Sequence, residues 1–347
     1  MHKFVRERRG ENLKREQKHF ILLKPLFVLA ISLLLTVSAF AESLVPGGRA
    51  LGIRMSTDGV IVAGLTEVKT QGGSLYPARD AGIQPGDLIV RVGGKDIQSG
   101  EDFLASMREL DNETVSVTFE REGRLRQVNV TPAECDDGSR KLGVMLRDGI
   151  SGVGTLTFYD PESGIYGALG HSISDADTGE ILPLAEGEIY AADISGVTRG
   201  AVGTPGALNG SADTDCVLGS IGINCACGIF GKAELNGEGT IETGEMKTGE
   251  ATILCTVGGS ETGEYKIEIS RVCKTPDSCT AVLHVTDPKL IELCGGIVQG
   301  MSGSPIIQDG RLVGAVTHVF INDPTGGYGI SIQDMLEAAE KCIGSAA

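Results

Sequence analysis

The sequence predicts a mainly β protein of two or three domains. Glycine makes up 50 of the 347 residues, about twice its usual share, which favours turns and short strands over long helices. From Leu142 onward, short runs of β-branched residues alternate with glycine, a pattern typical of a β-sandwich or barrel. Charged residues make up 22% and hydrophobic residues 41% of the chain, values that exclude wholesale disorder and a polytopic membrane protein.

Residues 1–41 have the pattern of an export segment. Residues 1–25 carry eight Lys or Arg and three Glu, and residues 26–41 form an uncharged apolar run that ends in Ala39-Phe40-Ala41. The run is long enough for a signal peptide and marginal for a spanning helix, and its small-residue end is typical of a signal peptidase site. We expect a secreted chain or one anchored by residues 26–41, with a buried core helix as the alternative.

The rest of the chain is strongly acidic. The residues after position 25 hold 22 Lys or Arg against 43 Asp or Glu. Such a body repels phosphate backbones, which excludes nucleic acid as a partner.

Residues 44–134 are predicted to form a small α+β module. Glycine-rich turns separate its strands, and one helix begins at a Ser-x-x-Asp cap. The predicted elements are strands at 59–65, 88–92, 114–121 and 126–131 and helices at 74–82 and 99–110.

The module resembles a PDZ domain in the order of these elements and in the turn Ile83-Gln84-Pro85-Gly86-Asp87-Leu88-Ile89. The resemblance implies that C-terminal or internal peptides bind by adding a strand to the module. Leu51, Gly52 and Ile53 would then form the loop whose backbone N–H groups receive the peptide carboxylate. A different small β-rich domain is the alternative.

A polar segment at 135–141 is the predicted linker to a second domain at 142–347. Within this second domain, only the C-terminal end, from Ile332 to Cys342, has helical periodicity. Strands are predicted at 152–159, 187–194, 250–257, 265–270, 281–285, 312–319 and 328–332.

The segment from Gly300 to Ile307, GMSGSPII, is the strongest chemical motif in the chain. A nucleophilic serine needs a tight turn that exposes its hydroxyl and directs nearby N–H groups at the carbonyl oxygen under attack, and flanking glycines allow that geometry. The segment resembles the nucleophile loop of trypsin-like β-barrel proteases. By that resemblance Ser302 is the nucleophile and the N–H groups of Gly300 and Ser302 form the oxyanion hole. A simple turn between two strands is the alternative.

A serine nucleophile also needs a base within hydrogen-bond reach. His171 ends an apolar strand at a turn of small residues and lies 131 residues before Ser302, the chain order of a chymotrypsin-like barrel. We therefore predict that His171 is the base, and we expect His284 and His318 to be structural. For the orienting acid, trypsin-like spacing favours Asp213 or Asp215.

A closer resemblance favours another acid. The chain is similar to the stage IV sporulation protein B peptidase family in several features. These are the apolar N-terminal segment, the PDZ-like module ahead of the serine loop, and the motifs Gly170-His171-Ser172-Ile173 and Thr286-Asp287-Pro288. The similarity extends through the tail at 314–325 and covers residues 26–343. It implies a catalytic triad of His171, Asp287 and Ser302.

The same resemblance implies a function. Members of the family are serine endopeptidases of endospore formers, exported into the space between the forespore membranes. There they cleave the extracytoplasmic part of a membrane-bound regulator, which activates a late mother-cell sigma factor, and they cleave and associate with themselves. An envelope quality-control protease and a non-catalytic PDZ scaffold are the alternatives, although quality-control proteases usually place the protease domain before the PDZ domain.

The nine cysteines give no sign of a metal site. No Cys-x-x-Cys pair and no histidine at zinc-finger spacing is present, so we expect neither metal nor cofactor. Cys225 with Cys227, and Cys273 with Cys279, are candidates for disulfides in an exported chain, while buried thiols are the alternative.

Overall fold

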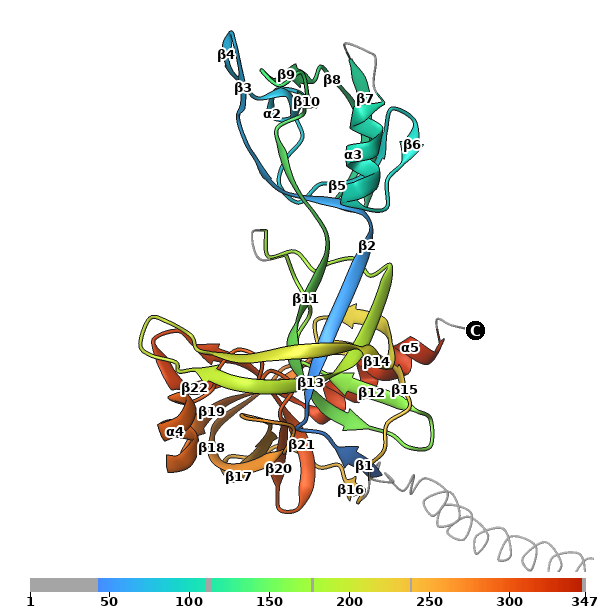
Figure 1. Ribbon diagram of the computed structural model, residues 1–347. Coiled ribbons are helices and arrows are strands. Elements are labelled where there is room, and N and C mark those ends of the chain that lie inside the picture. The colour runs from blue at the N-terminus through green and yellow to red at the C-terminus, as the bar shows by residue number, and fades with distance from the viewer. Residues whose placement is uncertain (1–42, 110–113, 176–177, 238, 345–347) are drawn as a thin grey trace, which may run out of the picture. The chain divides into compact units, whose positions relative to one another are not determined.

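The computed structural model describes residues 43–109, 114–175, 178–237 and 239–344. The predicted export segment at 1–41 lies outside these ranges. Within them, no helix has the length and apolar character that crossing a membrane requires. As predicted, most of the described chain is β-strand (Figure 1).

Six strands close into a first barrel. They follow one another in the order β11–β12–β15–β14–β13–β2, and the pairing of β11 with β2 completes the ring. Its interior holds a hydrophobic cluster that includes Leu51, Tyr166 and Ile189. The strands are β2 (Ala50–Leu65), β11 (Val144–Tyr159), β12 (Ile165–Ala168), β13 (Glu186–Thr198), β14 (Ala207–Cys225) and β15 (Gly228–Ala233), with β1 (Ser43–Pro46) and β16 (Ile241–Glu242) extending the sheet beside β11.

A second closed barrel contains the serine motif. It follows the order β17–β18–β19–β22–β21–β20, and alternate residues of β17 and β19 are buried in its core. The strands are β17 (Gly249–Cys255), β18 (Gly263–Lys274), β19 (Cys279–Val285), β20 (Pro305–Gln308), β21 (Arg311–Phe320) and β22 (Asp323–Ser331). Two closed barrels in sequence agree with the predicted trypsin-like architecture.

Two helices accompany the second barrel. The α4 helix (Pro288–Cys294) was not predicted, and it ends at Gly295, which adopts a left-handed φ of 81°. The α5 helix (Ile332–Gly344) agrees with the predicted C-terminal helix, and Met335 and Ala339 on it are buried.

The PDZ-like module has its own core around Ile89, Phe103 and Phe119. Ser99 caps its main helix by accepting a hydrogen bond from the Asp102 N–H, as the sequence predicted. The elements are β3 (Val68–Thr70), β4 (Gly73–Leu75), α2 (Pro77–Asp80), β5 (Leu88–Val92), β6 (Lys95–Asp96), α3 (Gly100–Arg108), β7 (Val115–Arg121) and β8 (Arg124–Val130). The predicted linker at 135–141 partly pairs as β9 (Ala133–Glu134) with β10 (Arg140–Lys141).

The first residues assigned to the PDZ-like module belong instead to the sheet of the first barrel. β1 pairs with β11 and β16, and the first half of β2 pairs with β11 on one edge and β13 on the other. Leu51 and Ile53 are buried in the first barrel. Because both edges of Leu51-Gly52-Ile53 are engaged in the sheet, the structure does not give these residues the predicted role of carboxylate-binding loop.

Candidate active site

The serine loop lies against the first barrel through two threonines of β11. Thr155 Oγ1 donates to the Gly300 carbonyl and Thr157 Oγ1 to the Gly303 carbonyl, each at 2.7 Å. The Thr155 N–H also donates to the Ser302 carbonyl at 3.0 Å. Both hydroxyls belong to buried residues, so these bonds hold the loop in one conformation.

Glycines give the loop its shape, as predicted. Gly300 and Gly303 have φ values of 97° and 95°, which side chains rarely adopt. Within the described ranges, the N–H groups of Gly300 and Ser302 donate to no other backbone carbonyl, whereas the N–H groups of Met301 and Gly303 do. The two N–H groups assigned to the oxyanion hole are therefore available to an incoming oxygen.

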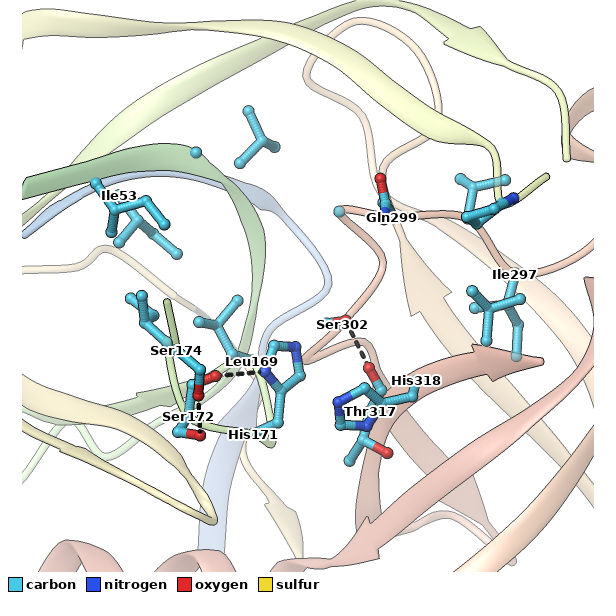
Figure 2. Close-up of a pocket in the computed structure, with 18 of the residues that line it drawn as sticks. Ile53, Leu169, His171, Ser172, Ser174, Ile297, Gln299, Ser302, Thr317 and His318 are labelled. Carbon is cyan, nitrogen blue, oxygen red and sulfur yellow. Dashed lines mark hydrogen bonds between the residues drawn. The ribbon is translucent and has the colours of Figure 1, made fainter. Parts of the chain in front are cut away.

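His171 and Ser302 come from different barrels and line the same cleft (Figure 2). His171 follows β12 after Leu169 and Gly170, which both have positive φ. Its Nδ1 lies 2.8 Å from the Ser172 carbonyl, a contact in which a protonated Nδ1 donates and leaves Nε2 free as a base. The Ser302 hydroxyl donates to the Thr317 carbonyl at 2.6 Å, so it would have to rotate before it could donate to His171.

His318 also lines this cleft, although the sequence led us to expect a structural residue. Its ring stacks on that of His171 with centroids 4.6 Å apart and an interplanar angle of 35°. His284, by contrast, contacts the Thr325 hydroxyl outside the cleft. The position of His318 near the end of β21, the second strand after the serine loop, is the sequence signal that could have identified it.

Asn224 is a second residue near His171 that the sequence did not predict. Its Oδ1 accepts from the Ile173 N–H at 2.8 Å, and its Nδ2 donates to the carbonyls of Ile173 and Leu182. These three bonds fix the chain directly after His171. A single asparagine at the end of a strand carries no sequence pattern that reveals this role.

The cleft has a volume of about 800 Å³ and an uncharged lining. Aliphatic side chains form much of its wall, and no Asp, Glu, Lys or Arg of the described chain lines it. The apolar lining includes Pro205, Ile297, Val298, Val319 and Ile321. Such a surface favours apolar side chains and disfavours charged ones, which would lose their hydration there.

The structure does not bring any predicted acid to His171. Asp287 caps α4, where Oδ1 accepts from the N–H groups of Lys289 and Leu290, and Oδ2 accepts from the Lys266 N–H. Asp213 and Asp215 lie on an exposed part of β14. In this conformation the Ser172 carbonyl, rather than a carboxylate, contacts the His171 Nδ1.

Asp287→Asn is expected to keep peptidase activity within about tenfold of the native value, because asparagine caps helices as well as aspartate does. Asp287→Ala is expected to lower the free energy of unfolding by about 1 kcal/mol through loss of the cap. Steady-state kinetics and urea denaturation of both variants test this. A loss of about 10⁴-fold in kcat for Asp287→Asn, with stability preserved, would instead establish Asp287 as the triad acid.

The pH dependence of peptidase activity should follow the protonation of His171. Burial lowers the pKa of His171 below its usual 6.5, the contact with the Ser172 carbonyl opposes this, and the neighbouring His318 adds to the lowering. The base must be neutral, so activity should fall as pH decreases through this pKa. We expect kcat/KM to be half-maximal below pH 6.5, and a half-maximum above pH 6.5 would contradict the burial of the active base.

Comparison with known families agrees with this geometry. The family model for SpoIVB peptidase S55 matches residues 138–336, and the model for the PDZ domain matches residues 72–121. The peptidase match includes both His171 and Ser302.

Curated relatives match only in part. A zinc metalloprotease of Staphylococcus aureus (strain MRSA252) is 37% identical over 67 residues, which are 19% of this chain and 15% of that protein. Zinc metalloprotease RasP of Shouchella clausii is 31% identical over 97 residues, which are 28% of this chain and 21% of that protein. The chain thus spans about a fifth or less of the length of these relatives.

Two solved structures have weak overall similarity. The active form of the Rv3671c protease from M. tuberculosis is 15% identical with a TM-score of 0.33, covering 56% of this chain and 74% of that one. The HtrA-type protease AlgW with decapeptide is 14% identical with a TM-score of 0.31, covering 59% and 54%. The family match, which covers more than half of the chain, shows that this protein belongs to the SpoIVB peptidase S55 family of serine peptidases and carries a PDZ domain.

Proposed function

We propose that this protein is an exported endopeptidase that cleaves extended protein segments by acylating Ser302. The observation that carries the proposal is the single cleft in which His171, Ser302 and the free N–H groups of Gly300 and Ser302 meet. A cleft lined by both barrels, with apolar walls, suits an internal peptide segment better than a small polar ligand.

The reaction follows from these positions. Ser302 Oγ turns from the Thr317 carbonyl and attacks the scissile carbonyl while His171 Nε2 takes its proton. The oxygen that becomes negative is stabilised by the N–H groups of Gly300 and Ser302. His171 then protonates the departing amine, and a water molecule activated by His171 releases the acyl group from Ser302.

The aliphatic walls predict the preferred substrates. Peptides with Leu, Ile or Phe on the acyl side of the scissile bond are expected to have a kcat/KM at least about tenfold higher than peptides with Arg or Asp there. A fluorogenic peptide library that varies only this position measures the ratio. A preference for a charged residue would contradict the apolar cleft as the binding site.

For the physiological role we propose sporulation, on the basis of the family to which the chain belongs. The substrate would be the extracytoplasmic part of a membrane-bound regulator in the space between the forespore membranes, and its cleavage would activate a late mother-cell sigma factor. Secretion or anchoring by residues 26–41 would place the enzyme there, and self-cleavage and self-association would accompany maturation. The PDZ module would bind peptides of the substrate or of a second copy.

A Ser302→Ala allele in the source bacterium tests this role. Late mother-cell transcription should be lost while growth stays normal. Normal spore formation combined with sensitivity to envelope stress would favour a quality-control protease, and an allele without any effect would favour a non-catalytic scaffold.

A further inference from the structure

Two thiols lie in a tight turn at the edge of the catalytic cleft. In the hairpin between β14 and β15, Cys225 pairs with Gly228, so Ala226 and Cys227 form its two-residue turn. Ala226 is exposed and lines the cleft. Cys225 and Cys227 are free, half-buried thiols, and each is the hydrogen-bond partner of the other.

Both flanks of this turn hold the segment that carries His171. On one side Asn224 makes its three hydrogen bonds to Ile173 and Leu182. On the other side Gly228 packs so closely that an added Cβ would lie 2.5 Å from the Ala168 carbonyl oxygen and 3.3 Å from the Gly170 nitrogen. A change in the shape of the turn must therefore displace the chain immediately before or after His171.

The two thiols are suited to react with each other. Residues two apart have Cα atoms roughly 5–7 Å apart, a range that overlaps the 4.4–6.8 Å of disulfides. The hydrogen bond from Cys227, together with those from the N–H groups of Cys227 and Gly228, lowers the pKa of Cys225 to about 6 against the opposing effect of burial. Cys225 is therefore largely a thiolate, the nucleophilic form, at neutral pH.

The other candidate disulfide has no such geometry. Cys273 pairs with Thr280 across the sheet, and Cys279 pairs with Lys274. Cys273 and Cys279 consequently point to opposite faces of their strands.

We propose that Cys225 and Cys227 form a redox modification site, which a disulfide-class oxidant closes into an intrachain disulfide that slows acylation of Ser302. With glutathione disulfide, the Cys225 thiolate attacks one sulfur and releases a first glutathione thiolate. The Cys227 thiol loses its proton, attacks the Cys225 sulfur and releases a second. The dithiol gives up two electrons and two protons, and one glutathione disulfide becomes two glutathione molecules.

Closure changes the turn because the sulfur atoms must come within about 2.05 Å and take a restricted dihedral angle. Asn224 and Gly228 adjoin the closing ring on either side, so the contacts that hold His171 are the ones disturbed. The reduced protein is then the active form.

The test uses the full chain with Cys216→Ser, since Cys216 shares the tryptic peptide 200–232 with both thiols. The protein is equilibrated in glutathione buffers from fully reduced to fully oxidised. Each sample is analysed for the disulfide by mass spectrometry, for the rate at which a fluorophosphonate probe labels Ser302, and for hydrogen exchange at the Ile173 amide.

We expect a Cys225–Cys227 disulfide, labelling at least tenfold slower and Ile173 exchange at least tenfold faster, all reversed by dithiothreitol. Adding Cys225→Ser or Cys227→Ser should abolish all three changes, whereas adding Cys273→Ser, which removes an exposed thiol elsewhere, should preserve them. A mixed glutathione disulfide as the end product, or a disulfide without change in labelling and exchange, would overturn the proposal.

The interpretation of the labelling rate rests on the proposed function, but the disulfide mapping and the hydrogen exchange do not. If the reduced chain fails to label at Ser302, the proposed function fails. Disulfide mapping and Ile173 exchange then still decide whether the turn is a redox site coupled to the histidine segment.

Discussion

Replacing Ser302 by alanine is expected to lower kcat/KM for an apolar peptide by at least about 10⁴-fold, because the variant keeps the cleft and the two N–H donors but has no nucleophile. The hydroxyl contributes one hydrogen bond, to the Thr317 carbonyl, so stability should change by only about 1 kcal/mol. Hydrolysis of a fluorogenic peptide and a thermal unfolding curve measure the two effects.

Ser172→Ala is the matched control for this variant. Ser172 also lines the cleft, but its hydroxyl contacts that of Ser174 at 3.1 Å and has no place in the reaction. The control should retain activity within about threefold, in line with the loss of one half-buried hydrogen bond. Comparable activity losses in Ser302→Ala and Ser172→Ala would show that the cleft tolerates no change, and would leave Ser302 without a special role.

Gly303→Ala should have the largest effect on stability. Gly303 has a φ of 95°, and an added Cβ would lie 2.1 Å from the Thr155 carbonyl oxygen and 2.5 Å from the Leu169 nitrogen. These are backbone atoms of the first barrel, which cannot move aside as a flexible side chain would. We expect the free energy of unfolding to fall by about 3 kcal/mol or more, with loss of activity, because strain and overpacking add.

Gly310→Ala separates strain from packing. Gly310 has a similarly positive φ of 74°, but an added Cβ meets nothing within 4 Å. Gly310→Ala should lower the free energy of unfolding by about 1–2 kcal/mol, because only the backbone strain contributes. Urea denaturation of both variants gives the difference, and equal losses would contradict the close packing of the serine loop against the first barrel.

The features that could be predicted from sequence are those encoded locally. The serine loop carries its own conformational signal in Gly300 and Gly303, both of which have positive φ in the structure. His171 follows a short strand and a glycine, which is again a local pattern. The helix that begins after Ser99 was predicted from its cap, and the cap is present.

What could not be predicted depends on pairings between distant segments. Leu51-Gly52-Ile53 has the hydrophobicity and glycine expected of a PDZ loop, but its partners on β11 and β13 lie more than 90 residues away in the chain. No local pattern encodes such a pairing. The same applies to His318 and Asn224, whose roles arise only when β21 and the β14–β15 turn approach His171.

The role of Asp287 illustrates the same difference. An aspartate before Pro288 is a good helix cap, and the structure uses it that way through the N–H groups of Lys289 and Leu290. Because the chain leaves α4 at Gly295 and enters the wall of the cleft at Ile297, the cap also helps to position the segment that leads to Ser302. The family resemblance implied a triad role instead, and the kinetics of Asp287→Asn decide between the two roles.

We expect that His171 activates Ser302, and covalent labelling of the full chain measures this activation. A fluorophosphonate probe is applied to the native protein, to His171→Gln and to His284→Gln, whose histidine lies outside the cleft, and the adducts are located by mass spectrometry. We predict one adduct, on Ser302, in the native protein and in His284→Gln, and none in His171→Gln. Labelling of Ser302 that persists in His171→Gln, or an adduct on another residue, would contradict the claim.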